Sequence, residues 1–272
     1  MKLLLFLLSS ALLLTVSAEE FEIYLLAGQS NMDGRGQASD LSEAQRAPST
    51  HAIIYYRNPP HSSEGWKPFG PGYSIAPKYK GQLPSPTFGP EIGFVETTLK
   101  SQPSKKLALI KGSKGGSSLR VDWNPGEKGN PKSQGPRYRS FIETIELALA
   151  ALKKDGHSGK IRGLIWHQGE SDSNQPTAAH QKRLINFIAR IREDVGNPNL
   201  PVVLGQVYDN GNRDKVRAAI SGASKAVPAC GLASAEGTKT WDPGTHFDAQ
   251  SQLLLGKRFA EEMINLLSGP TK

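Results

Sequence analysis

The sequence predicts an α/β fold, in which a central parallel sheet is covered by helices on both faces as a three-layer α/β/α sandwich. Three observations support this prediction: short apolar runs with strand character recur along the chain, amphipathic helical patterns separate them, and the runs end in glycine or polar residues. Such alternation favours a parallel sheet, because each crossover returns over one face. With 272 residues, the chain is long enough for a domain with a full core.

Five apolar runs are predicted strands, because each is short and bounded by glycine or polar residues. They cover residues 21–27, 107–111, 161–166, 202–206 and, more weakly, 231–235. Four amphipathic stretches are predicted helices. One carries apolar side chains on a single face from Phe141 to Leu152, and the others cover residues 178–195, 213–226 and 248–267.

Two long irregular segments, residues 57–90 and 113–136, interrupt this alternation. Irregular segments of this length inside a compact domain are usually functional. In an open parallel sheet, ligands bind beyond the carboxyl ends of the strands, which is where the polar motifs described below are expected to lie. We therefore expect a single active site at that edge of the sheet.

The first eighteen residues have the layout of a Sec signal peptide. Lys2 precedes a mostly apolar run over residues 3–16, and small residues form a cleavage site at 16–18. The apolar run is too short to span a bilayer comfortably. We expect cleavage near Ala18, a single domain over residues 19–272, no membrane span, and a secreted or periplasmic location.

The charge of the chain is positive but dispersed. The formal net charge of +8 falls by one, to +7, when Lys2 leaves with the signal peptide. The basic residues form no dense cluster and are not interleaved with aromatic residues, which argues against a nucleic-acid partner. Cys230 is the only cysteine, so no intramolecular disulfide can form, and its apolar neighbours predict a small core side chain.

Ser30 is the candidate nucleophile. It follows the first predicted strand in Gly28-Gln29-Ser30-Asn31-Met32, where a sharp turn would expose its hydroxyl group. A helix starting there would also direct free backbone N–H groups at the atom that the hydroxyl attacks. A serine at this position could equally serve only as a helix N-cap, so position alone leaves both roles open.

The glycine pair Gly115-Gly116 follows the second predicted strand. Glycine lets the backbone approach a ligand closely, so an N–H group here could donate to an oxyanion. Adjacent glycines also mark ordinary turns. No Gly-Lys-Ser/Thr sequence closes the segment, so the phosphate-binding P-loop pattern is absent.

The third predicted strand ends in the run Trp-His-Gln-Gly-Glu-Ser-Asp, residues 166–172. The Gln168 amide could donate to an oxyanion, and the Glu170 carboxylate could accept from a histidine ring. His167, Glu170 and Asp172 are also of metal-ligand types. However, alternate residues of a strand face opposite ways, and no second histidine cluster has ligand spacing, so we expect no metal.

The run Asp-Pro-Gly-Thr-His-Phe-Asp, residues 242–248, precedes the last predicted helix. A histidine titrates near neutrality, so His246 could take the proton of a serine and return it to a leaving alcohol. Asp242 could orient the ring, whereas Asp248 could cap the helix. A surface histidine without a catalytic role is the alternative. The Gly-x-Ser-x-Gly motif of α/β-hydrolases is absent, so a serine mechanism requires another scaffold.

In this order, the four blocks resemble those of the SGNH hydrolase superfamily. More narrowly, they resemble the sialate O-acetylesterase-like domain, which includes the acetylxylan esterases of carbohydrate esterase family 6. The similarity extends to residues 88–91, 122–125 and 252–260, and so covers nearly the whole mature chain. It implies a flavodoxin-like α/β/α sandwich, no metal or organic cofactor, Ser30 as nucleophile and His246 as base.

The resemblance also implies an oxyanion hole made of the Ser30 N–H, a Gly115 or Gly116 N–H and the Gln168 amide. We further expect Asn31 and Trp123 to contact the substrate. Trp123 would stack on a sugar ring, as could Trp66 and Tyr73, which are also on the long segments. The alternative for each aromatic residue is to anchor its loop.

Two departures from the superfamily pattern bear on the site. Gln168 stands where the superfamily name places an asparagine, as is usual in this subfamily. The superfamily aspartate lies three residues before the histidine, whereas Asp242 lies four residues before His246, with Pro243 inserted. Asp242 and Glu170 therefore both remain candidates for the orienting acid, with Glu170 slightly favoured.

Together these features predict a serine esterase that removes O-acetyl groups from carbohydrates through an acetyl-enzyme intermediate. Acetylated xylan, or a similar plant or algal polysaccharide, is the expected substrate. A sialate O-acetylesterase or a deacetylase of another glycan is the first alternative, because loops rather than fold set the substrate. A non-catalytic carbohydrate-binding protein on the same scaffold is the second.

Overall fold

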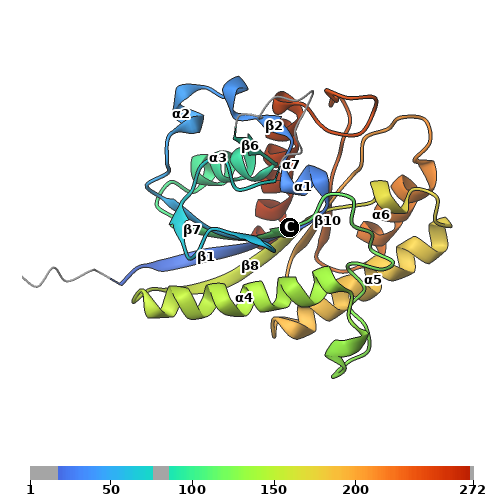
Figure 1. The fold of residues 1–272 in the computed structure, drawn as a ribbon, viewed down its shortest axis with the longest axis horizontal. Helices are drawn as coiled ribbons and strands as arrows, with labels where there is room; N and C mark the ends of the chain where they lie inside the picture. Colours follow the sequence, from blue (N-terminus) through green and yellow to red (C-terminus); the bar gives the residue numbers. More distant parts are fainter. Residues whose placement is uncertain (1–17, 76–85, 270–272) are drawn as a thin grey trace, which may run out of the picture.

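The computed structural model describes residues 18–75 and 86–269. Its centre is an eight-stranded sheet with the strand order β10-β9-β8-β1-β7-β3-β4, in which β5 also pairs with β3 (Figure 1). The strands that pair in parallel are β1 (Glu20–Gly28), β3 (Ala52–Asn58), β7 (Leu107–Ser113), β8 (Ser158–His167), β9 (Val202–Gly205) and β10 (Cys230–Ala233). Two short strands, β4 (His61–Ser62) and β5 (Lys67–Pro68), pair antiparallel with β3.

Helices cover both faces of this sheet (Figure 1). One face carries α4 (Pro136–Lys154), α5 (Thr177–Asp194) and α6 (Asp214–Ala226), and the other carries α3 (Glu91–Ser101) and α7 (Ala249–Ser268). Asp248 caps α7, because its Oδ1 accepts from the Ser251 N–H at 2.8 Å. The predicted α/β fold with a mostly parallel central sheet is confirmed.

The remaining elements are short. They are the helices α1 (Ser30–Asp33) and α2 (Glu43–Arg46), a two-stranded antiparallel pair of β2 (Gly36–Gln37) and β6 (Thr87–Phe88), and three 3-10 turns at Ala38–Asp40, Pro131–Ser133 and Glu170–Asp172.

The central strand β1 shows how the two faces are buried. Phe21, Ile23 and Leu25 belong to the hydrophobic cluster beneath α4 and α5, whereas Tyr24 and Leu26 belong to the cluster beneath α3 and α7. Alternate residues of a strand point to opposite faces, so a strand covered on both sides is a continuous apolar run. This is why β1 was predictable from sequence.

The sequence analysis missed several regular elements, of which β3 and α3 are the longest. The strand β3 covers Ala52–Asn58 and overlaps the start of the segment predicted to be irregular, and α3 begins at Glu91, just after that segment. β3 pairs in parallel with β7 and extends the sheet by one strand. Its sequence, Ala-Ile-Ile-Tyr-Tyr-Arg-Asn, contains the β-branched and aromatic residues typical of a strand.

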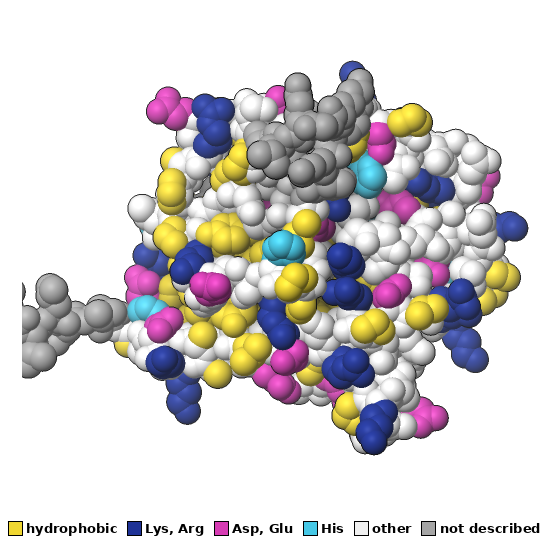
Figure 2. Space-filling model, viewed as in Figure 1, with side chains coloured by type: hydrophobic (Ala, Val, Ile, Leu, Met, Phe, Trp, Pro, Cys, Tyr) yellow, Lys and Arg dark blue, Asp and Glu magenta, His cyan; other side chains and the backbone are white. Residues whose placement is uncertain are grey.

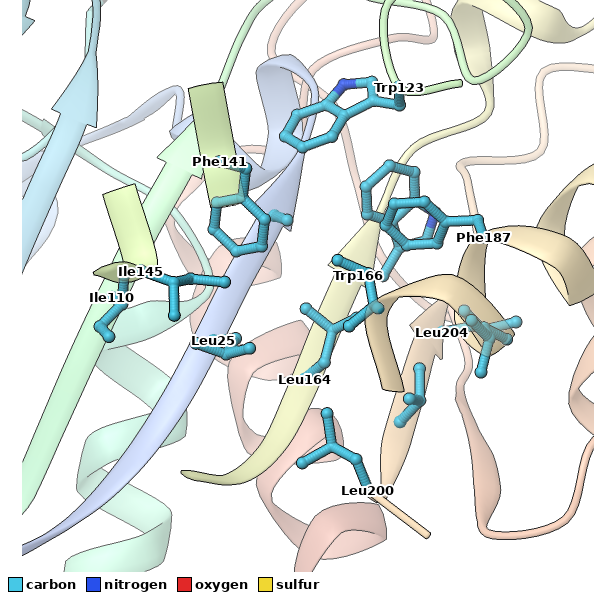
Figure 3. Close-up of a cluster of buried hydrophobic side chains, with 14 of the residues drawn as sticks. Leu25, Ile110, Trp123, Phe141, Ile145, Leu164, Trp166, Phe187, Leu200 and Leu204 are labelled. Carbon is cyan, nitrogen blue, oxygen red and sulfur yellow. The ribbon is translucent and has the colours of Figure 1, made fainter. Parts of the chain in front are cut away.

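Trp123 lies inside the core rather than on the surface (Figure 3). Its side chain is 1% exposed, its ring packs edge to face on Trp166 with centroids 5.1 Å apart, and its Nε1 donates to Ser117 Oγ at 2.8 Å. A ring enclosed in this way has no face open to a sugar. The expected stacking role of Trp123 is therefore wrong, and the residue anchors its loop.

A buried ion pair ties β7 to α3. The side chains of Lys111 and Glu91 are fully buried, with Nζ and Oε1 2.9 Å apart. Lys111 Nζ also donates to the Asp33 carbonyl at 2.8 Å, and the Gly89 N–H donates to Glu91 Oε1 at 2.9 Å. Because a buried charge is tolerated only when it is paired and hydrogen-bonded, this network holds α1 firmly against the sheet.

The expected signal peptide falls almost wholly outside the described residues, so it stays a prediction. Over residues 18–75 and 86–269, no helix has both the length and the apolar character needed to cross a bilayer. Cys230, at the start of β10, is partly buried against the core, and this burial raises the pKa of its thiol to about 12.

Candidate active site

Ser30 lies directly beyond the central strand β1, as the first residue of α1. The last residue of β1, Gly28, has a φ of 149°, and a Cβ there would lie 2.1 Å from the His167 carbonyl oxygen in β8. Only glycine permits so close an approach. The chain therefore turns sharply and brings Ser30, which is 4% exposed, to the carboxyl edge of the sheet.

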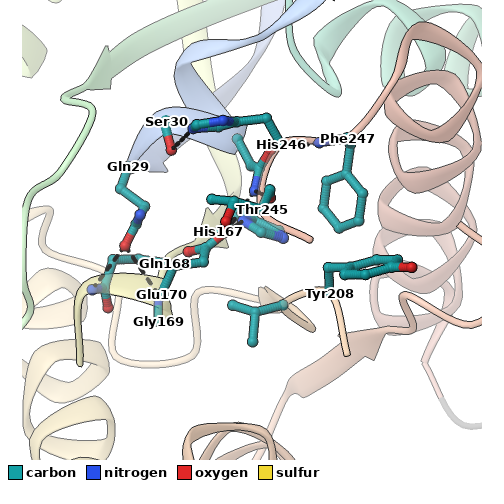
Figure 4. A network of polar contacts seen from close by, with 12 residues as sticks. Gln29, Ser30, His167, Gln168, Gly169, Glu170, Tyr208, Thr245, His246 and Phe247 are labelled. Atoms are coloured by element: carbon teal, nitrogen blue, oxygen red, sulfur yellow. Dashed lines mark hydrogen bonds and ion pairs between the residues drawn. The ribbon is translucent and has the colours of Figure 1, made fainter. Parts of the chain in front are cut away.

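His246 faces Ser30 from the loop before α7 (Figure 4). Its Nε2 is 3.1 Å from Ser30 Oγ, and its Nδ1 is 2.5 Å from Asp242 Oδ2. The other carboxylate oxygen, Asp242 Oδ1, accepts from the backbone N–H groups of Thr245 at 2.9 Å and His246 at 2.8 Å. The carboxylate is thus fixed behind the ring, so that Nε2 is presented to the serine.

The contacts of Asp242 also set its charge. Partial burial by itself would raise the pKa of Asp242. The hydrogen bonds from the backbone N–H groups of His246 and Thr245, and from the His246 ring, outweigh this and hold the pKa below its usual value. The carboxylate therefore stays ionised near neutral pH, where it can stabilise a protonated ring.

Glu170, the other candidate acid, makes no hydrogen bond or ion pair with His246. Its Oε1 accepts from Asn31 Nδ2 at 2.6 Å and lies 3.9 Å from His167 Nδ1. The geometry therefore places Asp242, and not Glu170, on the ring of His246.

Asn31 does not reach the substrate pocket, contrary to expectation. Its side chain is fully buried. Besides Glu170, its Nδ2 donates to the Thr245 carbonyl at 2.9 Å, and its Oδ1 accepts from the Phe247 N–H at 3.1 Å. With both polar atoms bound within the protein, Asn31 links α1 to the loop that carries His246, so the expected substrate contact is wrong.

The other metal-ligand candidates also bind within the protein. His167 is fully buried with Nε2 3.2 Å from the Gln206 carbonyl, and burial lowers its pKa despite the nearby Glu170 charge. Asp172 Oδ2 accepts from the Leu119 N–H at 2.6 Å. Over the described ranges, no three His, Cys, Asp or Glu side chains are grouped so that they could hold a metal ion.

The predicted backbone donors lie beside Ser30. A Cβ on Gly115 would lie 3.6 Å from Ser30 Cβ. The glycine turn is closed by two hydrogen bonds, from Lys114 N to the Gly28 carbonyl at 3.1 Å and from Ser117 N to the Lys114 carbonyl at 3.2 Å. Among the described residues, neither the Gly115 nor the Gly116 N–H donates to another backbone group, and the Ser30 N–H has no acceptor within its helix.

Gln168, the predicted side-chain donor, is fully buried and does not line the pocket. Its Nε2 donates to Asp172 Oδ2 at 2.8 Å, and to the Ser117 carbonyl and Gln29 Oε1 at 3.2 Å each. An amide engaged by three protein acceptors has no hydrogen left for a substrate. The structure therefore does not bring Gln168 together with the other predicted oxyanion donors.

An open pocket of about 570 Å³ surrounds Ser30 and His246. The lining residues that the sequence analysis did not single out include Gln29, Arg35, Lys114 and Arg213. Arg35 pairs with Asp33 at 2.9 Å, whereas Arg213 donates to the Gly244 carbonyl at 2.9 Å and to Thr245 Oγ1 at 3.1 Å. The run Asp-Gly-Arg-Gly after Ser30 could have indicated Arg35, but nothing comparable marks Arg213.

Two further aromatic features complete the surroundings. Trp241 stacks on the His246 ring, with centroids 5.6 Å apart and planes 15° apart. Trp66 and Tyr73, expected as sugar-stacking residues, donate to backbone carbonyls, those of Ala148 at 2.9 Å and Pro68 at 3.1 Å. On the face of the molecule shown in Figure 2, Lys and Arg are interspersed with Asp and Glu.

Comparisons with known proteins place the chain in a family. Residues 20–265 match the family model described as "Carbohydrate esterase, sialic acid-specific acetylesterase". A probable carbohydrate esterase of Arabidopsis thaliana is 23% identical over 270 residues, which is 90% of either chain. An Arabidopsis thaliana protein of known structure superimposes with a TM-score of 0.69 at 21% identity, covering 92% of this chain and 99% of that one.

Two other solved structures share the fold. NanS superimposes with a TM-score of 0.67 at 15% identity, covering 94% of this chain and 100% of its own. A carbohydrate acetylesterase from Xanthomonas citri gives 0.64 at 19% identity, covering 92% of this chain and 57% of its own. Since the family model spans most of the sequence, the chain belongs to the carbohydrate esterase family of sialic acid-specific acetylesterases and is a carboxylic ester hydrolase.

Proposed function

We propose that this protein removes O-acetyl groups from carbohydrates, with Ser30 as nucleophile, His246 as general base and acid, and Asp242 as the orienting acid. One observation carries the proposal. An unbroken line of hydrogen bonds, with 2.5 Å between Asp242 Oδ2 and His246 Nδ1 and 3.1 Å between His246 Nε2 and Ser30 Oγ, ends in an open pocket. This arrangement activates a hydroxyl group for attack on an ester.

The reaction has two acyl-transfer steps. Ser30 Oγ attacks the acetyl carbonyl carbon as its proton passes to His246 Nε2, which gives a tetrahedral intermediate with a negative oxygen. The intermediate collapses when the bond to the sugar oxygen breaks, and the sugar leaves as an alcohol with the proton from His246. Water then repeats the sequence on the acetyl-enzyme, releasing acetate and free Ser30.

The resemblance of the sequence motifs supports acetylated xylan, or a similar plant or algal polysaccharide, as the substrate. The openness of the pocket to the surface is compatible with a polymer chain. The cavity volume is within the usual range for small-ligand sites, so it accommodates a few sugar atoms around the acetyl group rather than a long chain segment.

The charge of the pocket favours a second candidate substrate, an acetylated acidic sugar such as a sialic acid. Lys114 and Arg213 line the pocket, and neither is paired with a carboxylate among the described residues. A sugar carboxylate would complement these positive charges. The description of the matching family, sialic acid-specific acetylesterase, is in line with this candidate.

The test is acetate release by the purified mature protein from acetylated xylan, O-acetylated sialic acid and a small aryl acetate, beside the Ser30→Ala variant. Release from one glycan by the wild type alone would support the reaction and identify the substrate class. Hydrolysis of only the aryl acetate, again dependent on Ser30, would support the esterase and reject both glycans. If the folded wild type releases acetate from none of them, the enzymatic proposal fails, and a carbohydrate-binding role replaces it.

We further propose that the enzyme acts outside the cytoplasm after cleavage near Ala18. The support is the charge and hydropathy pattern of residues 1–18. N-terminal sequencing of the protein recovered from the periplasm or medium of an expressing bacterium should start near Glu19. An intact N-terminus in the cytoplasm would contradict the proposal.

A further inference from the structure

The resemblance implies a side-chain donor in the oxyanion hole beside the backbone N–H groups, and the structure offers one that the motifs did not indicate. Gln168, the expected donor, is bound within the protein. We propose that the Gln29 amide nitrogen donates to the oxyanion, and that Gln168 acts one step behind as a positioning residue. This inference rests on the proposed function, because it assigns a third donor to the same acyl transfer.

The orientation of the Gln29 amide follows from its partners. Its Oε1 accepts from the Gly169 N–H at 3.4 Å and from Gln168 Nε2 at 3.2 Å (Figure 4). It also accepts from the Ser171 N–H at 3.2 Å. Backbone N–H groups can only donate, so the atom facing them must be the carbonyl oxygen. The amide nitrogen of Gln29 must therefore point away from this group of donors.

The orientation of Gln168 is fixed in the same way. Its Nε2 faces the Ser117 carbonyl and the Asp172 carboxylate, which can only accept. Asp172 is itself held by the Leu119 N–H at 2.6 Å. A rigid line thus runs from the Leu119 backbone through Asp172 and Gln168 to the oxygen of Gln29.

Gln29, at the end of this hydrogen-bonded chain, reaches the pocket. Gln29 precedes Ser30 and lines the same cavity, although its side chain is only 2% exposed. Its Nε2 donates to no described residue. A buried, pre-oriented donor beside the nucleophile is what a developing negative oxygen requires, because it need not reorganise during the reaction.

Two variants of Gln29 distinguish a role as donor to the oxyanion from a purely structural role as acceptor. Gln29→Glu keeps an oxygen for Gly169, Ser171 and Gln168 but replaces the pocket-facing nitrogen with a second oxygen. Gln29→Met removes both functions at similar size. We expect both to lower kcat for the aryl acetate by about 10²–10³-fold with little change in KM.

Gln168→Met is the matched variant for the positioning role. Since Gln168 would act through Gln29, the double variant Gln29→Met/Gln168→Met should be no slower than Gln29→Met alone. Affinity for methylboronic acid, whose boron binds Ser30 Oγ as a tetrahedral adduct while the proton passes to His246, should fall in parallel with kcat/KM. The pH profile of kcat/KM should keep its shape, because the His246–Asp242 contact is untouched.

The outcomes are distinct. If Gln29→Glu retains wild-type kcat while Gln29→Met loses it, Gln29 is a structural hub and the inference is overturned. If Gln168→Met and Gln29→Met add their losses, Gln168 acts independently, and the positioning role is rejected. If the wild type releases acetate from none of the three acetyl esters, or Ser30→Ala hydrolyses them equally, the proposed function itself fails. If circular dichroism shows that Gln29→Met does not fold, the comparison of Gln29→Glu with the wild type decides, because Gln29→Glu keeps the oxygen that accepts from Gly169, Ser171 and Gln168.

Discussion

Two segments of this molecule have nearly the same chemical content but different surroundings. The segment of residues 166–172 contains a histidine, a glutamate and an aspartate, and that of residues 242–248 contains a histidine and two aspartates. His167 is fully buried and bound to a backbone carbonyl. His246 instead has one ring nitrogen on Asp242 and the other on Ser30.

The difference shows that the partners of a histidine, rather than its sequence neighbours, set its chemistry. In the first segment, Glu170 is bound to Asn31 and Asp172 to backbone and Gln168, so neither acid is available to a catalytic ring. Burial also lowers the pKa of His167 and keeps it neutral. The first segment therefore supports the site, and the second presents a base to the pocket.

The strongest test of this contrast is Asp242→Asn. The amide oxygen can still accept from the backbone N–H groups of Thr245 and His246, but its NH2 would donate to His246 Nδ1 and leave the ring proton on Nε2. We expect kcat for a small acetyl ester to fall by about ten-thousand-fold, as in the well-studied triad whose ring is held in the wrong tautomer. A loss below tenfold, with the fold intact, would remove Asp242 from the mechanism.

Asn31 joins the two segments, so its loss should weaken the fold. Asn31→Ala would leave Glu170 Oε1, the Thr245 carbonyl and the Phe247 N–H without their buried partner. We expect the free energy of unfolding to fall by about 3 kcal/mol, or roughly a hundredfold in the unfolding constant. Urea unfolding monitored by fluorescence measures it. A change within about 0.5 kcal/mol, the usual scatter of surface substitutions, would show that this link does not stabilise the fold.

Glu170→Gln is the matched control for Asp242→Asn. The glutamine oxygen can still accept from Asn31 Nδ2, and Glu170 makes no hydrogen bond to His246. We expect kcat to change by less than about tenfold, through slight displacement of the Asn31 link only. If Glu170→Gln were as slow as Asp242→Asn, the assignment of the acid would have to be reversed.

The smallest effect concerns acid stability. Since the pKa of Asp242 is lowered in the folded state, its contacts add stability above the ordinary carboxyl pKa of about 4 and lose it as the pH falls through the lowered value. The Tm difference between wild type and Asp242→Asn should therefore favour the wild type near neutral pH and shrink in acid. A difference that grows on acidification would contradict the lowered pKa.

Sequence patterns predicted the buried framework of the fold well. The strand from Phe21 to Ala27 is apolar on both faces because helices cover both, so its residues alone indicate a central strand. The strand β3 was missed although it has a strand-like sequence, because it runs directly into a segment rich in proline and glycine. The positions of Ser30 and His246 after a strand and before a helix were equally informative.

Side-chain directions at the site were much less predictable. Gln29 and Gln168 are the same residue type at the same edge of the sheet, and only their hydrogen-bond partners show which one faces the pocket. Likewise, Trp123 occurs in a polar loop, yet its ring packs into the core against Trp166. Pairings of this kind depend on residues distant in the sequence, which local patterns do not record.

Ser30 and His246 are attached to parts of the fold that differ in how firmly they are held. Ser30 follows β1, which pairs with strands on both sides. His246 instead lies on a connecting loop that is tied to the rest of the protein by side-chain hydrogen bonds, among them those of Asn31, Arg213 and Ser251. Local opening of that loop would inactivate the enzyme while the sheet stays folded. On warming, activity should disappear reversibly below the global transition, and amide hydrogens of the loop should exchange with deuterium long before those of β1.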